Sequence, residues 1–242
     1  MEKNWQIAEQ NKLESSRLAN ALGISLTVAG FLVHRGLSDA AAARRFLYPE
    51  TEQESYDPFL LRDMDKAVAR ICQAVEKKER IIVYGDYDVD GITATTVLVR
   101  CLRQLGADVS YYIPNRLTEG YGFKAEALRK IKDGGADLLV SVDCGISAVA
   151  EVAGIAAELD IVITDHHLPG PTLPAALAVV DPHRKDCTYP YEELAGVGVA
   201  FKLCQALWRE LRQEEYEQDL ELVALGTVAD IVPLLDENRK FV

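Results

Sequence analysis

The stretch GDYDVDGITAT at residues 85–95 places three aspartates on alternate positions: Asp86, Asp88 and Asp90. A D-x-D-x-D-G pattern also opens an EF-hand calcium loop, which closes with a bidentate Glu at its twelfth position. That position is Val97, so this loop cannot close around calcium. The apolar run at 81–84 is typical of a buried strand and not of the helix that enters an EF-hand. The sequence therefore predicts a group of carboxylates at the end of a strand.

Three other apolar runs also end in acidic or imidazole side chains, in the segments LLVSVDCG, IVITDHH and AVVDPHR. These segments contain three of the four histidines: His166, His167 and His183. In an open α/β sheet, ligands bind outside the carboxyl ends of the strands. We therefore expect the four polar clusters to converge on one crevice.

The residue types in these clusters indicate a metal site. Mixed carboxylate and imidazole ligands without thiolate suit Mn²⁺ or Mg²⁺, and less firmly Zn²⁺ or Fe²⁺. Two such ions roughly 3.5–4 Å apart, bridged by a carboxylate, commonly hydrolyse phosphate esters. The sequence has no G-x-S-x-G elbow and no Walker A loop, which leaves a metal-activated hydroxide as the expected nucleophile. An adjacent histidine pair alone is more typical of a surface turn, and the neighbouring strand ends are what favour a metal site.

The elements that must position these residues alternate between strands and helices. Strands are predicted at 81–84, 109–113, 138–142, 161–163 and 177–180, and helices at 93–105, 124–131 and 146–159. Helical crossovers of this length imply parallel strand pairs covered on both faces. The predicted fold class is α/β, with a largely parallel sheet flanked by helices.

The first part of the chain carries helical patterns only. Short helices are predicted at 18–22, 26–33 and 39–47. Ser38 is the expected N-cap of the third helix, and a linker containing Pro58 leads to an amphipathic helix at 63–78. We expect a helical N-terminal region and linker over residues 1–62, followed by the catalytic domain over residues 63–242.

Composition limits the classes of protein that fit. With 242 residues, 49% of them hydrophobic, the chain can bury a substantial core. The N-terminus lacks the apolar segment of a signal peptide and no stretch approaches the roughly 20 residues of a membrane span, so we expect a cytoplasmic protein without a membrane partner. Five cysteines without a C-x-x-C pair fit a reducing compartment. The net charge of −12 argues against a broad basic footprint, so a nucleic-acid function has to act locally, where bound cations invert the sign.

Several motifs together resemble a known family. The segments DVDG, VDCG, DHH and GTVADIVPL resemble the DHH phosphoesterase superfamily. The surrounding segments DPFLLRDMDKAV, YYIPNR with EGYG, VVDPHR and AGVGVAFKL resemble the RecJ-type single-strand-specific exonucleases in particular. The resemblance runs from about residue 15 to the end of the sequence, with every expected motif present in order.

The resemblance implies a set of ligands for two divalent cations, Mn²⁺ or Mg²⁺. By position in the motifs, the implied catalytic and metal-binding residues are Asp88, Asp90, Asp143, His166, His167 and Asp230. Asp143 matches the aspartate that bridges the two metals. Asp165 is expected to hold a ligand imidazole in its orientation, as such partners commonly do. Asp86 is expected to act in the same indirect way, with direct ligation left open.

Four further residues are candidates for substrate contacts. Arg116 is predicted either to donate to a phosphate or to be a solvated loop arginine. His183 either binds phosphate or orients water, or it caps the turn after Asp181. Gly196 and Gly198 open a predicted helix through Trp208, where their amides either face an anion or allow close helix packing.

The leading functional hypothesis is a metal-dependent 5′ to 3′ exonuclease domain for DNA repair and recombination, with polarity and substrate implied by the resemblance alone. Its expected partners are single-stranded DNA and other DNA repair proteins. One alternative is a DHH phosphodiesterase of short oligonucleotides or cyclic dinucleotides. Others are a phosphohydrolase of small substrates and a non-catalytic scaffold related to replication factors.

The RecJ-type family also implies parts that this sequence lacks. In these enzymes a second domain, DHHA1, and further DNA-binding modules follow the DHH domain. The sequence stops shortly after Asp230, in DENRKFV, with nothing recognisable as DHHA1. We therefore expect a fragment that binds metal and hydrolyses DNA poorly when alone.

Overall fold

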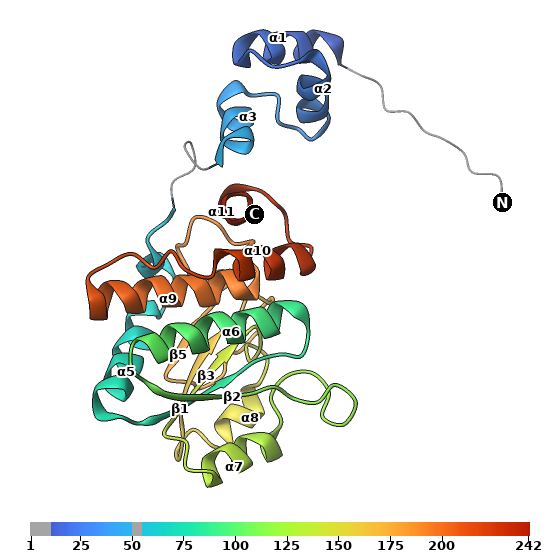
Figure 1. Cartoon of the computed structure of the whole chain (residues 1–242). Coiled ribbons are helices and arrows are strands. Elements are labelled where there is room, and N and C mark those ends of the chain that lie inside the picture. The colour runs from blue at the N-terminus through green and yellow to red at the C-terminus, as the bar shows by residue number, and fades with distance from the viewer. Residues whose placement is uncertain (1–10, 50–54) are drawn as a thin grey trace, which may run out of the picture. The chain divides into compact units, whose positions relative to one another are not determined.

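The computed structural model describes residues 11–49 and 55–242, and the chain divides into two compact units between residues 54 and 55 (Figure 1). The described part of the first unit contains three helices: α1 (Lys12–Leu22), α2 (Leu26–His34) and α3 (Ala40–Leu47). Its small core is formed by Leu18, Ala29, Leu32 and Ala43, each at most 3% exposed. The three short helices predicted from the sequence are therefore present.

The N-cap of α3 differs from the prediction. Asp39, and not Ser38, accepts the hydrogen bond from the Ala42 amide, at 2.9 Å from Oδ1. The physical reason is register: an N-cap side chain reaches the amide three residues on, and the first helical residue here is Ala40.

Replacing Asp39 with Ala is expected to destabilise α3 by about 1 kcal/mol, because one orphan amide loses its acceptor. Amide hydrogen exchange should report this as roughly fivefold faster exchange across α3, whereas Ser38→Ala should leave it close to the parent rate. A larger effect from Ser38→Ala than from Asp39→Ala would contradict the assignment.

The second unit is built on one five-stranded parallel sheet. Its strands are β1 (Arg80–Tyr84), β2 (Asp108–Tyr112), β3 (Leu138–Val142), β4 (Asp160–Thr164) and β5 (Ala178–Val180). They lie in the order β2-β1-β3-β4-β5, and each neighbouring pair is parallel. The predicted α/β fold with a largely parallel sheet is confirmed.

Helices cover both faces of this sheet. The described helices of this unit are η1 (Pro58–Leu60), α5 (Met64–Lys77), α6 (Val89–Gln104), α7 (Ala125–Asp133), α8 (Val149–Ala153), α9 (Gly196–Arg212), α10 (Leu220–Ala229) and α11 (Asp236–Phe241). Figure 1 shows α5, α6 and α9 on one face, and α7 and α8 on the other. No single helix in the described part of the chain is both long and apolar enough to cross a membrane. Only α1 and α2 taken together reach such a length and apolar content, and the chain bends sharply between them.

The strands are apolar without alternation because both faces are buried. Ile81 and Val83 belong to the core under α5, α6 and α9, whereas Ile82 and Tyr84 belong to the core against α7 and α8. Successive side chains of a strand point to opposite faces. The short apolar run before the aspartates is thus a central strand with two hydrophobic faces.

Two segments differ from the sequence predictions. The helix predicted at 146–159 is helical only over Val149–Ala153 and continues as turns from Gly154. Ile155 and Leu159 are still buried there, which explains the helical spacing of apolar residues, while glycine has the weakest helix propensity after proline. The predicted linker also packs: Pro58 and Leu61 are buried in the second unit.

The strand order creates one crevice at the carboxyl edge of the sheet. The chain leaves β1 toward β2 on one side, whereas β3 pairs with β1 on the other side. The loops that follow β1 and β3 therefore separate at this point, which is the topological switch point where open α/β sheets bind ligands.

Candidate metal centre

The loop after β1 delivers the three alternating aspartates to the switch point. Asp86 and Asp90 are buried, while Asp88 is exposed and caps α6 by accepting a hydrogen bond from the Gly91 amide at 2.9 Å. A Cβ on Gly91 would lie 2.7 Å from the backbone of Asp86. Glycine at this position therefore lets the first turn of α6 pack directly against Asp86. This close packing keeps the carboxylates of the loop near one another.

Asp143 follows β3 in a strained conformation. Its φ is 59°, in the left-handed region that few non-glycine residues occupy, and its side chain is buried. Among residues with a Cβ, Asp and Asn tolerate this region best. Such strain persists where surrounding structure enforces it, and it is frequent at functional sites.

The loop after β4 carries the Asp165–His166–His167 motif, in which Asp165 is the organiser. Its Oδ1 accepts hydrogen bonds from the His166 amide at 2.8 Å and from His167 Nδ1 at 2.7 Å, and its Oδ2 accepts from the Ile146 amide at 2.9 Å. Burial alone would raise the pKa of Asp165, but these donors hold that pKa below its usual value. With Nδ1 of His167 donating to Asp165, the free lone pair of that ring lies on Nε2.

The structure brings the candidate ligands together in three overlapping groups. Within each group one ligand atom per residue lies within 4.8 Å of the others: Asp143, His166 and His167; Asp90, His166 and Asp230; Asp86, Asp88 and Asp143. Asp143 and His166 each belong to two groups. The three groups therefore form one continuous centre with room for more than one ion.

His166 lies in the middle of three carboxylates. Its Nε2 is 3.2 Å from Asp143 Oδ1, 3.7 Å from Asp230 Oδ2 and 3.8 Å from Asp90 Oδ2. Burial by itself lowers the pKa of His166, but these three carboxylates raise it above its usual value. For the carboxyl groups of Asp90 and Asp143, burial has the opposite effect and raises the pKa, because it disfavours their charged form.

Several buried atoms in this centre have no hydrogen-bond partner. They are Asp86 Oδ1, Asp143 Oδ1 and His166 Nε2 among the described residues. An unpaired buried polar atom is costly, and a bound water or ion is the usual way in which a protein satisfies it. Carboxylate oxygens and an imidazole nitrogen that converge in this way are the ligands that a divalent cation takes once their protons are displaced, so the residues present fit such ions.

The N-terminus of α9 holds Asp90 in place. The Gly196 and Val197 amides donate to Asp90 Oδ2 and Oδ1 at 2.7 and 2.8 Å. The anion predicted at this helix terminus is thus a carboxylate of the chain itself, and Val197 rather than Gly198 supplies the second amide. Gly198 instead packs against Leu194, which a Cβ would approach to 3.4 Å.

Close packing by α10 brings Asp230 to the same place. A Cβ on Gly226 would lie 2.4 Å from Thr93 Oγ1 and 3.0 Å from Asp90 Oδ1, so only glycine allows α10 to approach α6 here. Asp230 ends α10 and Ile231 follows with a φ of 64°, an unusual value for a β-branched residue.

Arg116 and His183 have less definite positions. The Arg116 guanidinium lies 5.2 Å from the centre of the Tyr87 ring, next to the aspartate loop. The His183 amide donates to Asp181 Oδ1 at 2.7 Å, which is the predicted turn cap. The buried Nδ1 of His183 has no hydrogen-bond partner among the described residues and lies 3.9 Å from the same Asp181 oxygen. Substrate roles for these two residues stay predictions.

Sequence reasoning missed two residues at the centre. The Tyr121 hydroxyl lies 3.2 Å from His167 Nδ1 and donates to the Asp143 carbonyl at 3.5 Å. Asp181 is fully buried with one unpartnered oxygen, and burial raises its pKa to about 7. The position of Asp181 at a strand end was the available signal; no signal in the sequence singled out Tyr121 within EGYG.

The fold and this centre together are those of a recognised class. The model of the DHH family, N-terminal domain, matches residues 80–227. This range runs from β1 into α10 and contains every candidate ligand residue except Asp230. The chain belongs to the DHH family.

Within this family the chain is similar to RecJ proteins. The single-stranded-DNA-specific exonuclease RecJ of Bacillus subtilis (strain 168) is 48% identical over 237 residues, covering 97% of this chain and 29% of that relative. RecJ of Thermus thermophilus is 40% identical over 195 residues, covering 78% of this chain and 29% of that relative. The chain thus spans about a third of the length of these relatives or less.

Solved structures show the same similarity. A crystal structure of exonuclease RecJ bound to manganese matches with a TM-score of 0.69 and 40% identity, covering 75% of this chain and 46% of that chain. A crystal structure of RecJ from Thermus thermophilus in complex with Mn²⁺ matches with a TM-score of 0.76 and 33% identity, covering 95% of this chain and 32% of that chain.

Proposed function

We propose that this chain holds two divalent cations, Mn²⁺ or Mg²⁺, and forms the catalytic part of a 5′ to 3′ exonuclease for single-stranded DNA. The observation that carries the proposal is the sharing of Asp143 between ligand groups whose buried atoms lack other partners. The 48% identity to a RecJ protein over 97% of the chain supports the substrate class. We also propose, from the motif resemblance, a role in DNA repair and recombination in the cytoplasm, alongside other repair proteins.

The ligand groups suggest how the residues divide between two ions. Asp90, His166 and Asp230 would hold one ion, and Asp86, Asp88 and Asp143 would hold the other. Asp143 also groups with His166 and His167, which supports a shared role for Asp143 between the two ions. Bound divalent cations at such a site lower the pKa of water and neutralise charge on the phosphate. Asp86 then acts as a ligand, the direct role left open by the sequence.

The remaining residues orient these ligands. Asp165 fixes the tautomer of His167, and the α9 amides fix the carboxylate plane of Asp90. Because Asp90 and His166 are buried with little room to rotate, the centre is preorganised before a substrate binds.

The function is tested with labelled DNA and excess enzyme in single-turnover reactions with Mn²⁺. Single-stranded oligonucleotide should be shortened from its 5′ end, duplex DNA should resist, and Asp143→Asn should abolish cleavage. Cleavage restricted to dinucleotides or cyclic dinucleotides would support the phosphodiesterase alternative instead. Because the chain alone is expected to hydrolyse DNA poorly, slow cleavage of single-stranded DNA still supports the proposal. Bound metal with no cleavage of any of these phosphodiesters, even at long reaction times with excess enzyme, would contradict a nuclease.

Apparent Mn²⁺ affinity is expected to rise with pH between pH 6 and 8. Burial raises the pKa of Asp90 to about 6, and the surrounding carboxylates raise the pKa of His166 to about 9. The metal-free centre therefore holds protons in this range that an ion must displace, so affinity should rise about tenfold per pH unit for each displaced proton. Calorimetric titrations in buffers of different ionisation heat measure both affinity and proton release.

The same pKa shifts predict the pH dependence of stability without metal. The folded chain binds protons that the unfolded chain has released, so stability is highest at the acidic end and falls as pH rises toward 9. Thermal unfolding in EDTA should show this fall, and Mn²⁺ should reverse it. Affinity and stability that stay constant from pH 6 to 8 would contradict the prediction.

A further inference from the structure

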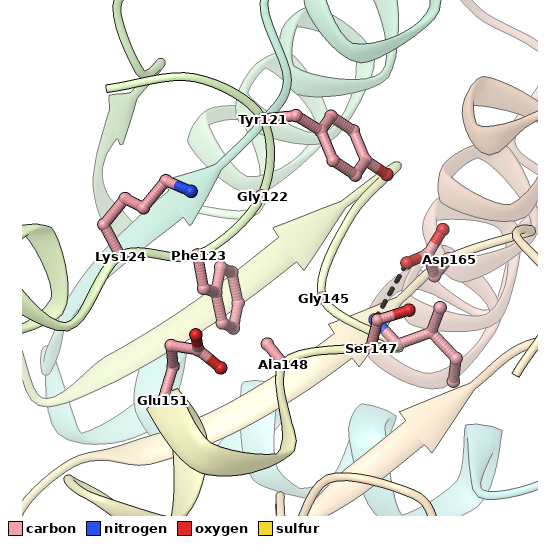
Figure 2. A pocket seen from close by; sticks show the side chains of 10 residues that line it. Tyr121, Gly122, Phe123, Lys124, Gly145, Ser147, Ala148, Glu151 and Asp165 are labelled. Atoms are coloured by element: carbon pink, nitrogen blue, oxygen red, sulfur yellow. Dashed lines mark hydrogen bonds between the residues drawn. The ribbon is translucent and has the colours of Figure 1, made fainter. Parts of the chain in front are cut away.

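A cavity of about 180 Å³ lies beside Asp165, outside the group of candidate metal ligands. Figure 2 shows Lys124 and Glu151 on one side of it, and Tyr121, Ser147 and Asp165 on the other. Phe123 and the turn at 145–148 complete the wall. No residue in this cavity other than Asp165 was predicted to act at the centre.

Two residues connect the cavity directly to the metal centre. Asp165 lines the cavity and also accepts a hydrogen bond from His167 Nδ1 at 2.7 Å. Tyr121 lines it too, with its hydroxyl 3.2 Å from the same nitrogen and its ring edge-to-face with the His167 ring. The cavity and the metal centre therefore share Asp165 and Tyr121 as wall residues and are direct neighbours.

The cavity offers hydrogen-bonding groups of both kinds. Lys124 and Ser147 are donors and the Glu151 carboxylate is an acceptor, and none of these side chains makes a hydrogen bond or ion pair with the rest of the described chain. Phe123 is buried and fixed by an edge-to-face contact with Tyr84, 4.9 Å between ring centres. The cavity thus combines a rigid aromatic wall with free polar groups.

Size and charge select the occupant. A cavity of about 150 Å³ holds a benzene molecule, so this one is large enough for a single pyrimidine ring. Lys124 is outnumbered among the lining residues by the carboxylates of Glu151 and Asp165, so the cavity has no net positive charge to hold a phosphate. Aromatic walls and edge-directed hydrogen bonds, in contrast, are how enzymes hold an unstacked base. Cytosine matches best, because its amino group donates to a carboxylate where thymine presents a carbonyl oxygen.

We propose that this cavity is a subsite for the base of the nucleotide whose phosphate lies at the metal centre, with a preference for cytosine over thymine set by Glu151. The inference rests on the proposed function and adds a base-reading element to it. It also assigns Lys124, Ser147 and Glu151 a role in substrate binding.

The test is calorimetric binding of three probes to the Mn²⁺-loaded chain: deoxycytidine monophosphate, deoxythymidine monophosphate and deoxyribose 5-phosphate. The cytosine nucleotide should bind about tenfold more tightly than the other two. Glu151→Gln, which adds a donor, should remove the preference for cytosine over thymine. Ala148→Phe should fill the cavity and reduce the cytosine nucleotide to the affinity of the sugar phosphate, whereas Ala150→Phe, on the exposed side of α8, should not.

The possible outcomes distinguish a failure of the subsite from a failure of the proposed function. Equal binding of all three probes, unchanged by Ala148→Phe, would overturn the subsite while leaving metal-dependent phosphate binding intact. Failure of every probe to bind, with Mn²⁺ bound normally, would contradict the proposed function and the subsite together. Titration of Mn²⁺ into each variant shows whether the variant has kept its centre, and retention of the metal with loss of base preference supports the proposal.

Discussion

Asp143→Asn is expected to reduce Mn²⁺ binding from two ions per chain to at most one, with about 100-fold weaker affinity or more. Changes to residues that merely support a ligand already cost about 10–100-fold, and Asp143 belongs to two ligand groups itself. Its Oδ1 lies 3.2 Å from His166 Nε2 and has no hydrogen-bond partner, so this oxygen is available to ions on both sides.

Asparagine is the appropriate replacement because of the backbone. Asp143 has a φ of 59°, and Asn tolerates this left-handed conformation whereas Ala is strained there. The substitution therefore removes charge without distorting the turn after β3. A loss of binding can then be attributed to the carboxylate.

Calorimetric titration of metal-stripped protein with Mn²⁺ measures the effect. Asp137→Asn is the matched control: Asp137 directly precedes β3, at the opposite end of the strand from Asp143, and its Oδ2 accepts a hydrogen bond from the Arg80 amide. The control should still bind two ions. Normal stoichiometry and affinity in Asp143→Asn would show that Asp143 bridges no metals.

Gly196→Ala is expected to lower the stability by about 1–3 kcal/mol, the usual cost of overpacking, and to weaken Mn²⁺ binding about 10–100-fold. The added Cβ would lie 2.6 Å from Asp143 Cβ and Oδ1, a distance that real structures do not tolerate. The first turn of α9 has to move away from Asp143. The hydrogen bonds from the Gly196 and Val197 amides to Asp90 should lengthen as a result.

Gly198→Ala is the matched control in the same helix. Its Cβ would meet Leu194 at 3.4 Å, an ordinary contact, and alanine favours a helix by up to about 1 kcal/mol over glycine. The two substitutions should therefore change stability in opposite directions. Urea unfolding in EDTA measures the stability, and Mn²⁺ calorimetry measures the centre. Equal effects at both positions would show that α9 does not press against Asp143.

The sequence by itself determined the fold class and much of the centre. Apolar runs alternating with helical periods predicted the parallel sheet, because strands buried on both faces need continuous apolar residues. Polar clusters after four of the runs predicted a convergent site, because the carboxyl ends of parallel strands lie at one edge. The motif resemblance implied the ligands, and the structure places Asp88, Asp90, Asp143, His166, His167 and Asp230 in overlapping groups.

The tertiary structure alone decided which atoms are free to bind and which are already used. That the anion at the α9 terminus is Asp90 depends on a contact across more than 100 residues, which no local pattern encodes. The same holds for the buried pair of Lys202 with Glu237, both 0% exposed, although residues 196–204 around Lys202 are otherwise apolar. Tyr121 and the cavity beside Asp165 were also invisible in the sequence, because the proximity of a loop to a histidine depends on how the whole sheet positions them.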